Sequence, residues 1–179
     1  MTRPHSLSTR ALAALAVCLV LLTGCTADLK PSPSPTPTPL FASKKDAFAA
    51  AEATYRAYND AGNATVLTDA RTFEDVYKWL RADALSSAKK AYSYYDAEGW
   101  RRVGETTFDH FTPISYDGED VTARLCIDVS HVDVLDSTGA SVVSPDRQPR
   151  QALELQLKPA LTSTGLAIVS SDATKELEC

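Results

Sequence analysis

The spacing of hydrophobic and polar residues changes past the middle of the chain, at Trp100. Before this residue, apolar side chains recur every three or four positions, which is typical of amphipathic helices. After it, apolar and polar residues alternate, which is typical of half-buried strands. The pattern predicts three helices: one capped by Ser43 and closed by Gly62-Asn63, then Phe73–Leu80 with Thr72 as its cap, then Ala84–Glu98. It also predicts four strands: Trp100–Asp109, Asp120–Leu135, Arg150–Lys158 and Gly165–Ser170.

The two faces of the predicted sheet differ in polarity. One face of the second strand is apolar and comprises Val121, Ala123, Leu125, Ile127 and Val129. Its other face comprises Thr122, Arg124, Cys126, Asp128 and Ser130. The third strand also has an apolar face, made of Leu153, Leu155 and Leu157. Helices followed by antiparallel strands predict an α+β domain in which the helices cover one face of the sheet.

The chain begins with a polar, basic segment that is followed by an uninterrupted apolar run. Ala11–Leu22 contains 12 residues, whereas a helix that crosses a bilayer needs about 20. A short apolar run behind a basic start is typical of a secretory signal peptide. We therefore expect residues 1–24 to direct export and to be removed afterwards.

The apolar run ends in Leu22-Thr23-Gly24-Cys25, which resembles the lipobox of bacterial lipoproteins. The resemblance implies that the Cys25 thiol takes up diacylglycerol as a thioether and becomes the first residue of the mature chain. Two acyl chains, such as palmitate, hold a protein stably on a membrane, whereas one is marginal. The expected location is the extracytoplasmic side of the cell membrane, with the lipid on Cys25 as the anchor.

A proline-rich segment separates this cysteine from the predicted domain. Lys30–Pro39 reads KPSPSPTPTP, and regular proline favours the extended polyproline II conformation. We interpret residues 25–42 as a stalk and residues 43–179 as the folded domain. A PxxP-type ligand and an O-glycosylated stalk are the alternative interpretations of this composition.

Charge excludes one class of partner. Loss of Arg3 and Arg10 with the signal leaves 16 basic and 23 acidic residues, which is a formal charge of −7. An acidic domain repels phosphate backbones, so we expect no nucleic-acid partner. The expected membrane contact is the lipid rather than a basic surface.

Four cysteines occur in the chain, and only two belong to the predicted domain. Cys18 lies in the signal and Cys25 is the lipid site, which leaves Cys126 and Cys179. An even pair in an exported domain favours a disulfide, with the C-terminal tail lying across the polar face of the sheet. Metal binding is the alternative, but two thiolates without His or Cys at ligand spacing are a poor zinc site, and we expect no metal.

The order of elements resembles that of NTF2-like (cystatin-like) proteins. The segments that carry this resemblance are Gly99–Thr106, Leu125–Ser130, Gly165-Leu166 and Cys179. They also resemble a group of small actinobacterial lipoproteins of unassigned function. The resemblance implies a cone of three N-terminal helices packed on a curved four-stranded antiparallel sheet. One feature of that fold, a short strand between the second and third helices, has no counterpart in the pattern.

NTF2-like relatives that are enzymes use Asp, His or Tyr inside the cone. Asp109-His110 and His131 are the candidates for such acid–base work. Asp109-His110 leads into a loop-like stretch, and His131 fits a half-buried position in the second strand, so we expect neither to be catalytic. The aromatic residues Tyr55, Tyr58, Tyr92, Tyr95 and Trp100 fit either a ligand cavity or, as their helical spacing favours, a packed core.

These observations predict a membrane-anchored, non-enzymatic binding or interaction module that needs no cofactor. Its interior is expected to be a packed core or an apolar pocket, with binding on an outer surface. The expected partner is an envelope protein or a small apolar ligand. The alternative function is a small cofactor-independent enzyme of the cyclase, isomerase or dehydratase type that uses the cone pocket.

Overall fold

A computed structural model describes residues 39–179. The predicted signal, the lipid site Cys25 and most of the stalk lie outside these residues. Within the described part, no helix is long and apolar enough to cross a membrane.

The helices begin close to where the pattern places them. Helix α1 spans Lys44–Ala64 and α3 spans Ala82–Ala97, with a short α2 at Glu74–Tyr77 between them. The predicted cap of α1 is confirmed: the Ser43 hydroxyl accepts a hydrogen bond from the Asp46 amide at 3.2 Å and donates one to the Asp46 carboxylate at 2.8 Å. The first of these bonds satisfies an amide group at the helix start, where no backbone partner exists.

The second helix differs from the prediction in its length and its cap. A 3₁₀ turn at Ala70–Thr72 precedes α2, and Phe73 occupies the N-cap position without a side-chain hydrogen bond. The Thr72 hydroxyl instead donates to the carbonyls of Val66 and Asp69. Thr72 therefore closes the loop before the helix, and the prediction of Thr72 as cap was wrong.

Within residues 39–179, six strands form two separate sheets. The main sheet is antiparallel, with the strand order β2-β3-β5-β6. Its strands are β2 Thr107–Tyr116, β3 Val121–Asp128, β5 Arg150–Pro159 and β6 Leu166–Ala173. A small two-stranded sheet consists of β1 Arg101–Val103 and β4 Asp133–Leu135.

Two of the predicted strands are each broken in two. The first breaks at Gly104, whose φ of +75° is left-handed and suits a residue without a Cβ. The second ends at Asp128, and His131 lies exposed in the turn before β4. The prediction of a half-buried His131 in a continuous strand was wrong: the apolar alternation reaches Val129, one residue past the end of the ladder, and the residues that follow form a turn.

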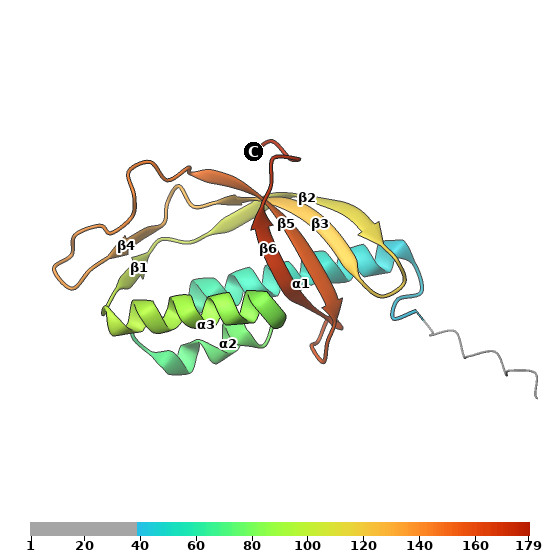
Figure 1. Ribbon diagram of the computed structural model, residues 1–179, viewed down its shortest axis with the longest axis horizontal. Coiled ribbons are helices and arrows are strands. Elements are labelled where there is room, and N and C mark those ends of the chain that lie inside the picture. The colour runs from blue at the N-terminus through green and yellow to red at the C-terminus, as the bar shows by residue number, and fades with distance from the viewer. Residues whose placement is uncertain (1–38) are drawn as a thin grey trace, which may run out of the picture. The chain divides into compact units, whose positions relative to one another are not determined.

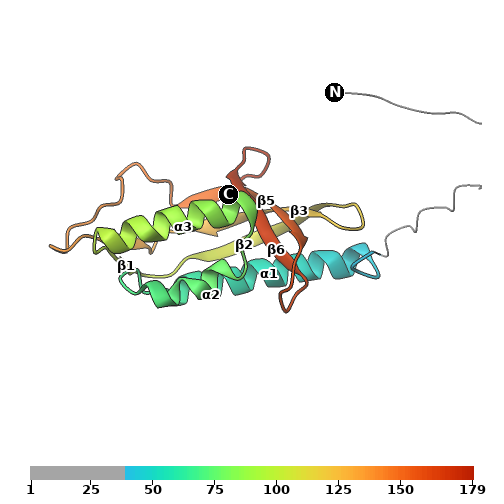
Figure 2. The same ribbon diagram turned by 60° about the horizontal axis from the view of Figure 1, so that its bottom comes forward.

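The helices lie on one face of the main sheet, and the C-terminal tail lies on the other (Figures 1 and 2). The apolar faces meet as predicted: Val121 is the register partner of Leu157, and Ala123 that of Leu155. All four side chains are buried, and residues of α1, including Ala51 and Tyr55, complete the core. The α+β architecture of three helices on a curved four-stranded sheet is therefore confirmed.

Two contacts extend the domain beyond the predicted elements. Leu80 forms a single parallel bridge with Ile168 of β6, at the place where the NTF2-like fold has its short strand. At the other end, Phe41 packs edge-on against Tyr116, with ring centroids 6.1 Å apart. The packed part of the chain thus begins two residues before Ser43.

Candidate functional site

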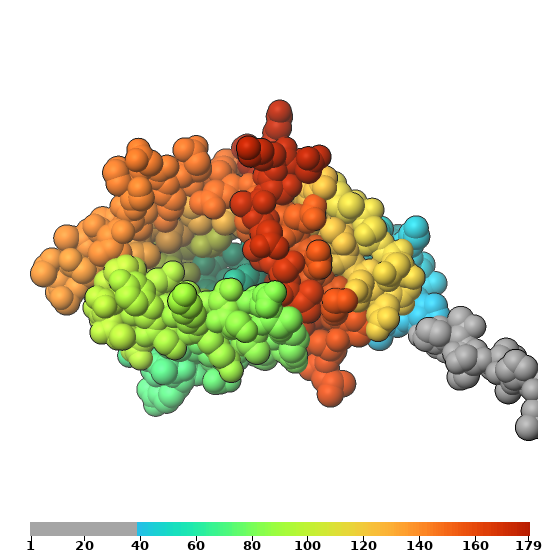
Figure 3. Space-filling model, in the orientation of Figure 1, coloured from blue at the N-terminus to red at the C-terminus, as the bar shows by residue number. Residues whose placement is uncertain are grey.

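A cavity of about 390 Å³ lies between α1, α3, the main sheet and the small β1–β4 sheet. Figure 3 shows the surface hollowed beside α3, below the segment that contains β4. The cavity is lined by Tyr55, Tyr58, Asn59, Gly62, Asn63, Leu67, Ala88, Ala91, Tyr92, Tyr95, Arg102, Thr106, Ile127, Val129, Val134, Leu153 and Ser171. Its volume is within the range of small-molecule sites, roughly 300–1,000 Å³.

Four tyrosines form the aromatic wall of the cavity. Tyr55 and Tyr58 come from α1, and their ring centroids are 5.6 Å apart. Tyr92 and Tyr95 come from α3, with centroids 6.2 Å apart. Each helix contributes two rings because residues three apart share a helix face. The five predicted aromatic residues therefore have different roles. Tyr55 is buried in the core and also lines the cavity, and the other three tyrosines line the cavity. Trp100 stacks on Tyr95 and does not line the cavity.

Burial favours the protonated form of three of these phenols. It raises the pKa of Tyr58 to about 12 and raises the pKa of Tyr55 and of Tyr92 as well. At neutral pH Tyr55, Tyr58 and Tyr92 are therefore neutral hydrogen-bond donors rather than bases. Such groups orient a ligand oxygen without adding charge to the wall.

One end of the cavity is polar and is organised around Asn63. The Asn63 side-chain amide donates to the Thr106 carbonyl at 2.8 Å, and its oxygen accepts from the Thr106 amide at 3.0 Å. Asn59, one helical turn earlier, donates to the same carbonyl at 3.0 Å. These bonds connect the end of α1 to the segment that leads into β2.

Arg102 is the only charged side chain that lines the cavity in the described part of the chain. Its guanidinium donates to the Asn63 side-chain oxygen at 3.1 Å and to the Asn63 backbone carbonyl. A cation at the C-terminal end of a helix is favourable because the last carbonyls carry partial negative charge. These bonds hold Arg102 at the cavity wall, where it supplies a positive charge.

A second hollow of about 330 Å³ lies between α3 and β6 and shares Tyr58, Ala88, Ala91 and Ser171 with the first. Its carboxylates, Asp83 and Asp172, are on exposed residues. The shared alanines have small side chains, so the surface of α3 is hollowed along this stretch.

The predicted acid–base candidates lie outside the cavity. Asp109 and His110 belong to β2 rather than to a loop, and their side chains are 50% and 66% exposed. The Arg150 guanidinium donates to Asp109 at 2.6 Å and lowers the pKa of that carboxyl. His131 is exposed in its turn, so the structure brings none of the three to the aromatic wall.

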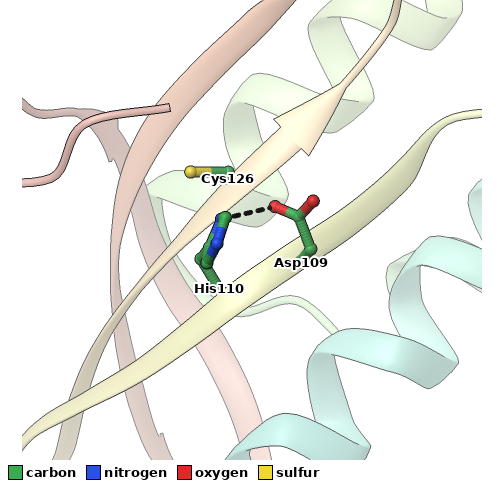
Figure 4. A group of neighbouring side chains, drawn as sticks. All are labelled: Asp109, His110 and Cys126. Atoms are coloured by element: carbon green, nitrogen blue, oxygen red, sulfur yellow. Dashed lines mark ion pairs between the residues drawn. The ribbon is translucent and has the colours of Figure 1, made fainter.

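The predicted disulfide between Cys126 and Cys179 is present, with the Cα atoms 5.6 Å apart. Cys126 lies on the polar face of β3, and the tail crosses that face as expected. The Arg150 guanidinium donates to the Cys179 carbonyl at 3.0 Å. Asp109, His110 and Cys126 also form a group whose potential metal-ligand atoms lie within 4.8 Å of one another (Figure 4).

Sequence reasoning missed the polar end of the cavity. Asn59 and Asn63 stand one helical turn apart, and this spacing signals a shared polar patch on α1. The signal for Arg102 was weaker, because a single arginine in a short strand is usually solvent-exposed. Its position in the cavity depends on the break at Gly104.

No family model matches the chain, and no curated protein sequence matches it either. Solved structures with a similar fold include a putative aromatic ring hydroxylase from Novosphingobium aromaticivorans (10% identity, 71% of this chain and 92% of that chain covered, TM-score 0.46). Another is Aln2 from a Streptomyces species (17% identity, 73% of this chain and 91% of that chain covered, TM-score 0.44). A third is an IcmL-like type IV secretion system protein from Legionella pneumophila (16% identity, 76% of this chain and 98% of that chain covered, TM-score 0.41). These likenesses are too distant to carry a conclusion about function.

Proposed function

We propose that this protein is an extracytoplasmic lipoprotein, held on the cell membrane by lipid on Cys25, whose domain binds a small aromatic ligand without transforming it. The observation that carries the binding function is the cavity of about 390 Å³ with its wall of tyrosines and its single arginine. The anchor rests on the lipobox Leu22-Thr23-Gly24-Cys25. The stalk gives the domain clearance from the membrane surface.

The lining specifies the chemistry of the ligand. Tyrosine faces favour planar aromatic rings, and the Arg102 guanidinium favours a carboxylate or another anionic group, which it can bind through paired hydrogen bonds. The best match is therefore a planar aromatic acid of one or two rings. This occupant differs from the outer-surface binding expected from the sequence, because part of the space between the helices and the sheet is an open and partly polar cavity.

The lining also favours binding over catalysis. Within the described part of the chain, no aspartate, glutamate or histidine lines this cavity. The phenols of Tyr55, Tyr58 and Tyr92 have raised pKa values, which makes them weak acids and poor sources of a base near neutral pH.

The alternative function is a cofactor-independent enzyme of the cyclase, isomerase or dehydratase type. The observation that favours it is the presence of phenol donors and the Arg102 guanidinium on one cavity. Donors fixed in a site can stabilise an enolate oxygen as its charge develops. Turnover of a β-keto aromatic substrate that is lost in the Arg102→Gln variant supports this alternative.

The binding proposal is tested by calorimetric titration of the full-length protein with 2-naphthoate. Ala91→Trp fills the cavity from α3 and is expected to weaken binding at least tenfold. Ala97→Trp, at the exposed end of the same helix, is the matched control and is expected to bind as the parent does. Equal affinity of parent and Ala91→Trp contradicts the proposal.

The contribution of Arg102 is tested by comparing two ligands that differ in charge. The parent is expected to prefer 2-naphthoate to the neutral 2-naphthamide, because the carboxylate meets the guanidinium. The Arg102→Gln variant is expected to lose this preference. A preference that survives in the variant contradicts the assignment of Arg102.

A further inference from the structure

An irregularity of β2 places two consecutive side chains on the same face of the sheet. Residues i and i+1 of a regular strand point to opposite faces. The register between β2 and β3 shifts after Asp109, and His110 has a left-handed φ of +50°. A β-bulge of this kind re-aims a side chain and is frequent beside functional sites.

The bulge brings an imidazole and a carboxylate beside a cysteine. Asp109 is the register partner of Cys126, and the His110 Nδ1 lies 3.1 Å from the Asp109 Oδ1. Figure 4 shows the Asp109 carboxylate and the His110 ring facing each other beside Cys126. The ligand atoms of all three residues lie within 4.8 Å of one another.

These distances are close to those of a tetrahedral zinc site. Zinc bonds of about 2.0–2.3 Å separate neighbouring ligand atoms by roughly 3.3–3.8 Å. Side-chain movements of about 1 Å therefore suffice to close the group around an ion. Sulfur, imidazole nitrogen and carboxylate oxygen together suit Zn²⁺ and exclude Ca²⁺ and Mg²⁺, which take oxygen ligands.

In the oxidised protein the Cys126 sulfur is bonded to Cys179 and is therefore not free to act as a thiolate ligand. Cys126 is buried under the tail, whereas Cys179 is exposed. Besides the disulfide, hydrogen bonds hold residues 174–179 on the sheet, and one of them runs from the Thr174 amide to the Ala152 carbonyl at 3.0 Å. Among them are the Arg150 contact with the Cys179 carbonyl and a long one, 3.5 Å, from Arg124 to the Glu176 carbonyl.

We propose that reduction of the Cys126–Cys179 disulfide creates a Zn²⁺ site whose ligands are the thiolates of Cys126 and Cys179, the His110 imidazole and the Asp109 carboxylate. The site lies on the face of the sheet opposite the helices. It is independent of the aromatic cavity and of the function proposed for it.

The reduction step requires a dithiol as reductant. One thiolate of the dithiol attacks a sulfur of the Cys126–Cys179 bond, and its second thiol resolves the mixed disulfide. The S–S bond of the protein breaks, two thiols form, and the dithiol becomes a disulfide. Zinc binding then displaces the two thiol protons to solvent.

In the oxidised protein, Asp109 already has a cationic partner, the Arg150 guanidinium. Arg150 lies between Asp109 at 2.6 Å and Asp128 at 3.3 Å. When an ion binds Asp109, the guanidinium keeps Asp128 as its partner. The bound Zn²⁺ thus takes the place that one arm of Arg150 holds in the oxidised protein.

The test uses the full-length chain with Cys18→Ser and Cys25→Ser, so that the domain carries the only thiols. The protein is reduced with a phosphine and titrated with Co²⁺, which reports thiolate coordination by a charge-transfer absorption. We expect saturation at one Co²⁺ per chain, displacement by Zn²⁺, and no such absorption in the oxidised protein. A reduced protein without the absorption overturns the proposal.

The histidine is tested by His110→Asn, since asparagine tolerates a positive φ and preserves the bulge. This variant is expected to bind Co²⁺ at least tenfold more weakly, whereas His131→Asn, in an exposed turn, is expected to match the parent. Equal affinity of His110→Asn and the parent overturns the proposal.

A second measurement applies if reduction loosens the fold. Zn²⁺ is then expected to raise the Tm of the reduced parent by several degrees and that of reduced His110→Asn by less, because an ion that binds only the folded state stabilises it in proportion to its affinity. A reduced parent whose Tm is the same with and without Zn²⁺ overturns the proposal.

Discussion

At the scale of single residues, Gly104 determines where the first predicted strand breaks. Its φ is +75°, and a Cβ added there lies 1.8 Å from the His131 carbonyl oxygen. We expect Gly104→Ala to lower the free energy of unfolding by about 3 kcal/mol or more, because backbone strain and a steric clash add. Urea unfolding measures the change.

The control for this substitution is Gly99→Ala. Gly99 also has a positive φ, +67°, but an added Cβ meets nothing within 4 Å. Gly99→Ala is expected to lower the free energy of unfolding by about 1 kcal/mol, because it adds the strain of a left-handed backbone without a steric clash. Equal costs for the two variants contradict the close approach of Gly104 to His131.

Tyr58 makes the stability of the domain sensitive to alkaline pH. Its pKa is raised from 10.0 to about 12 by burial, so the folded state holds the proton more tightly than the unfolded state does. The stability that follows is present below pH 10 and is lost as the pH rises from 10 to 12. Tyr58→Phe is therefore expected to lose less stability than the parent over this window.

The comparison is the Tm of each protein across that range of pH, with Tyr94→Phe as the control on an exposed tyrosine. The control is expected to follow the parent. The same dependence on pH in both variants contradicts the burial of a titrating phenol at Tyr58.

At the scale of elements, local signals predicted most of the fold. The ends of α1 and α3 follow from Ser43 and Gly99, whose side-chain and backbone requirements are local. The facing leucines of β5 follow from alternation. The break at Gly104 was missed because a glycine inside a strand pattern does not by itself end a strand. The break at Asp128 was missed because the apolar alternation extends to Val129, and only contacts between distant segments show where the ladder stops.

The C-terminal tail is an element held mainly by its disulfide. The two cysteines are 53 residues apart, and closing a loop of that length restricts the unfolded chain by about 4 kcal/mol in the chain-entropy account. We expect the double variant Cys126→Ala, Cys179→Ala to lose stability of this order in denaturant unfolding. A loss below about 1 kcal/mol contradicts this role of the disulfide.

At the scale of the whole molecule, the proposed anchor of the domain on the membrane is the lipid on Cys25. Cys25→Ser removes the thiol that forms the thioether, so we expect no labelling by a fatty-acid probe and an unprocessed or shed protein. Ser43→Thr, which keeps the helix cap, is expected to be labelled as the parent is. A cleaved, unlabelled Cys25→Ser protein that stays on the membrane contradicts the anchor.

The cavity shows the limit of what the sequence predicts for the whole molecule. Tyr55 and Tyr58 were assigned to one helix face, and Tyr92 and Tyr95 to another, by their spacing alone. Whether the two faces meet in a filled core or around an open cavity depends on the distance between α1 and α3. The bonds of Asn63 to Thr106 and Arg102 fix the end of α1 against the segment that follows α3, and they join residues far apart in the sequence.

The most direct test of the central claim is a map of where an aromatic acid binds. Backbone amide shifts of the full-length protein are recorded by NMR during titration with 2-naphthoate. We predict that the largest changes occur at cavity residues such as Asn63, Ala91 and Arg102, and that they vanish in Ala91→Trp. Changes confined to the outer face of the sheet, at residues such as Thr122 and Glu154, contradict the claim that the cavity is the binding site.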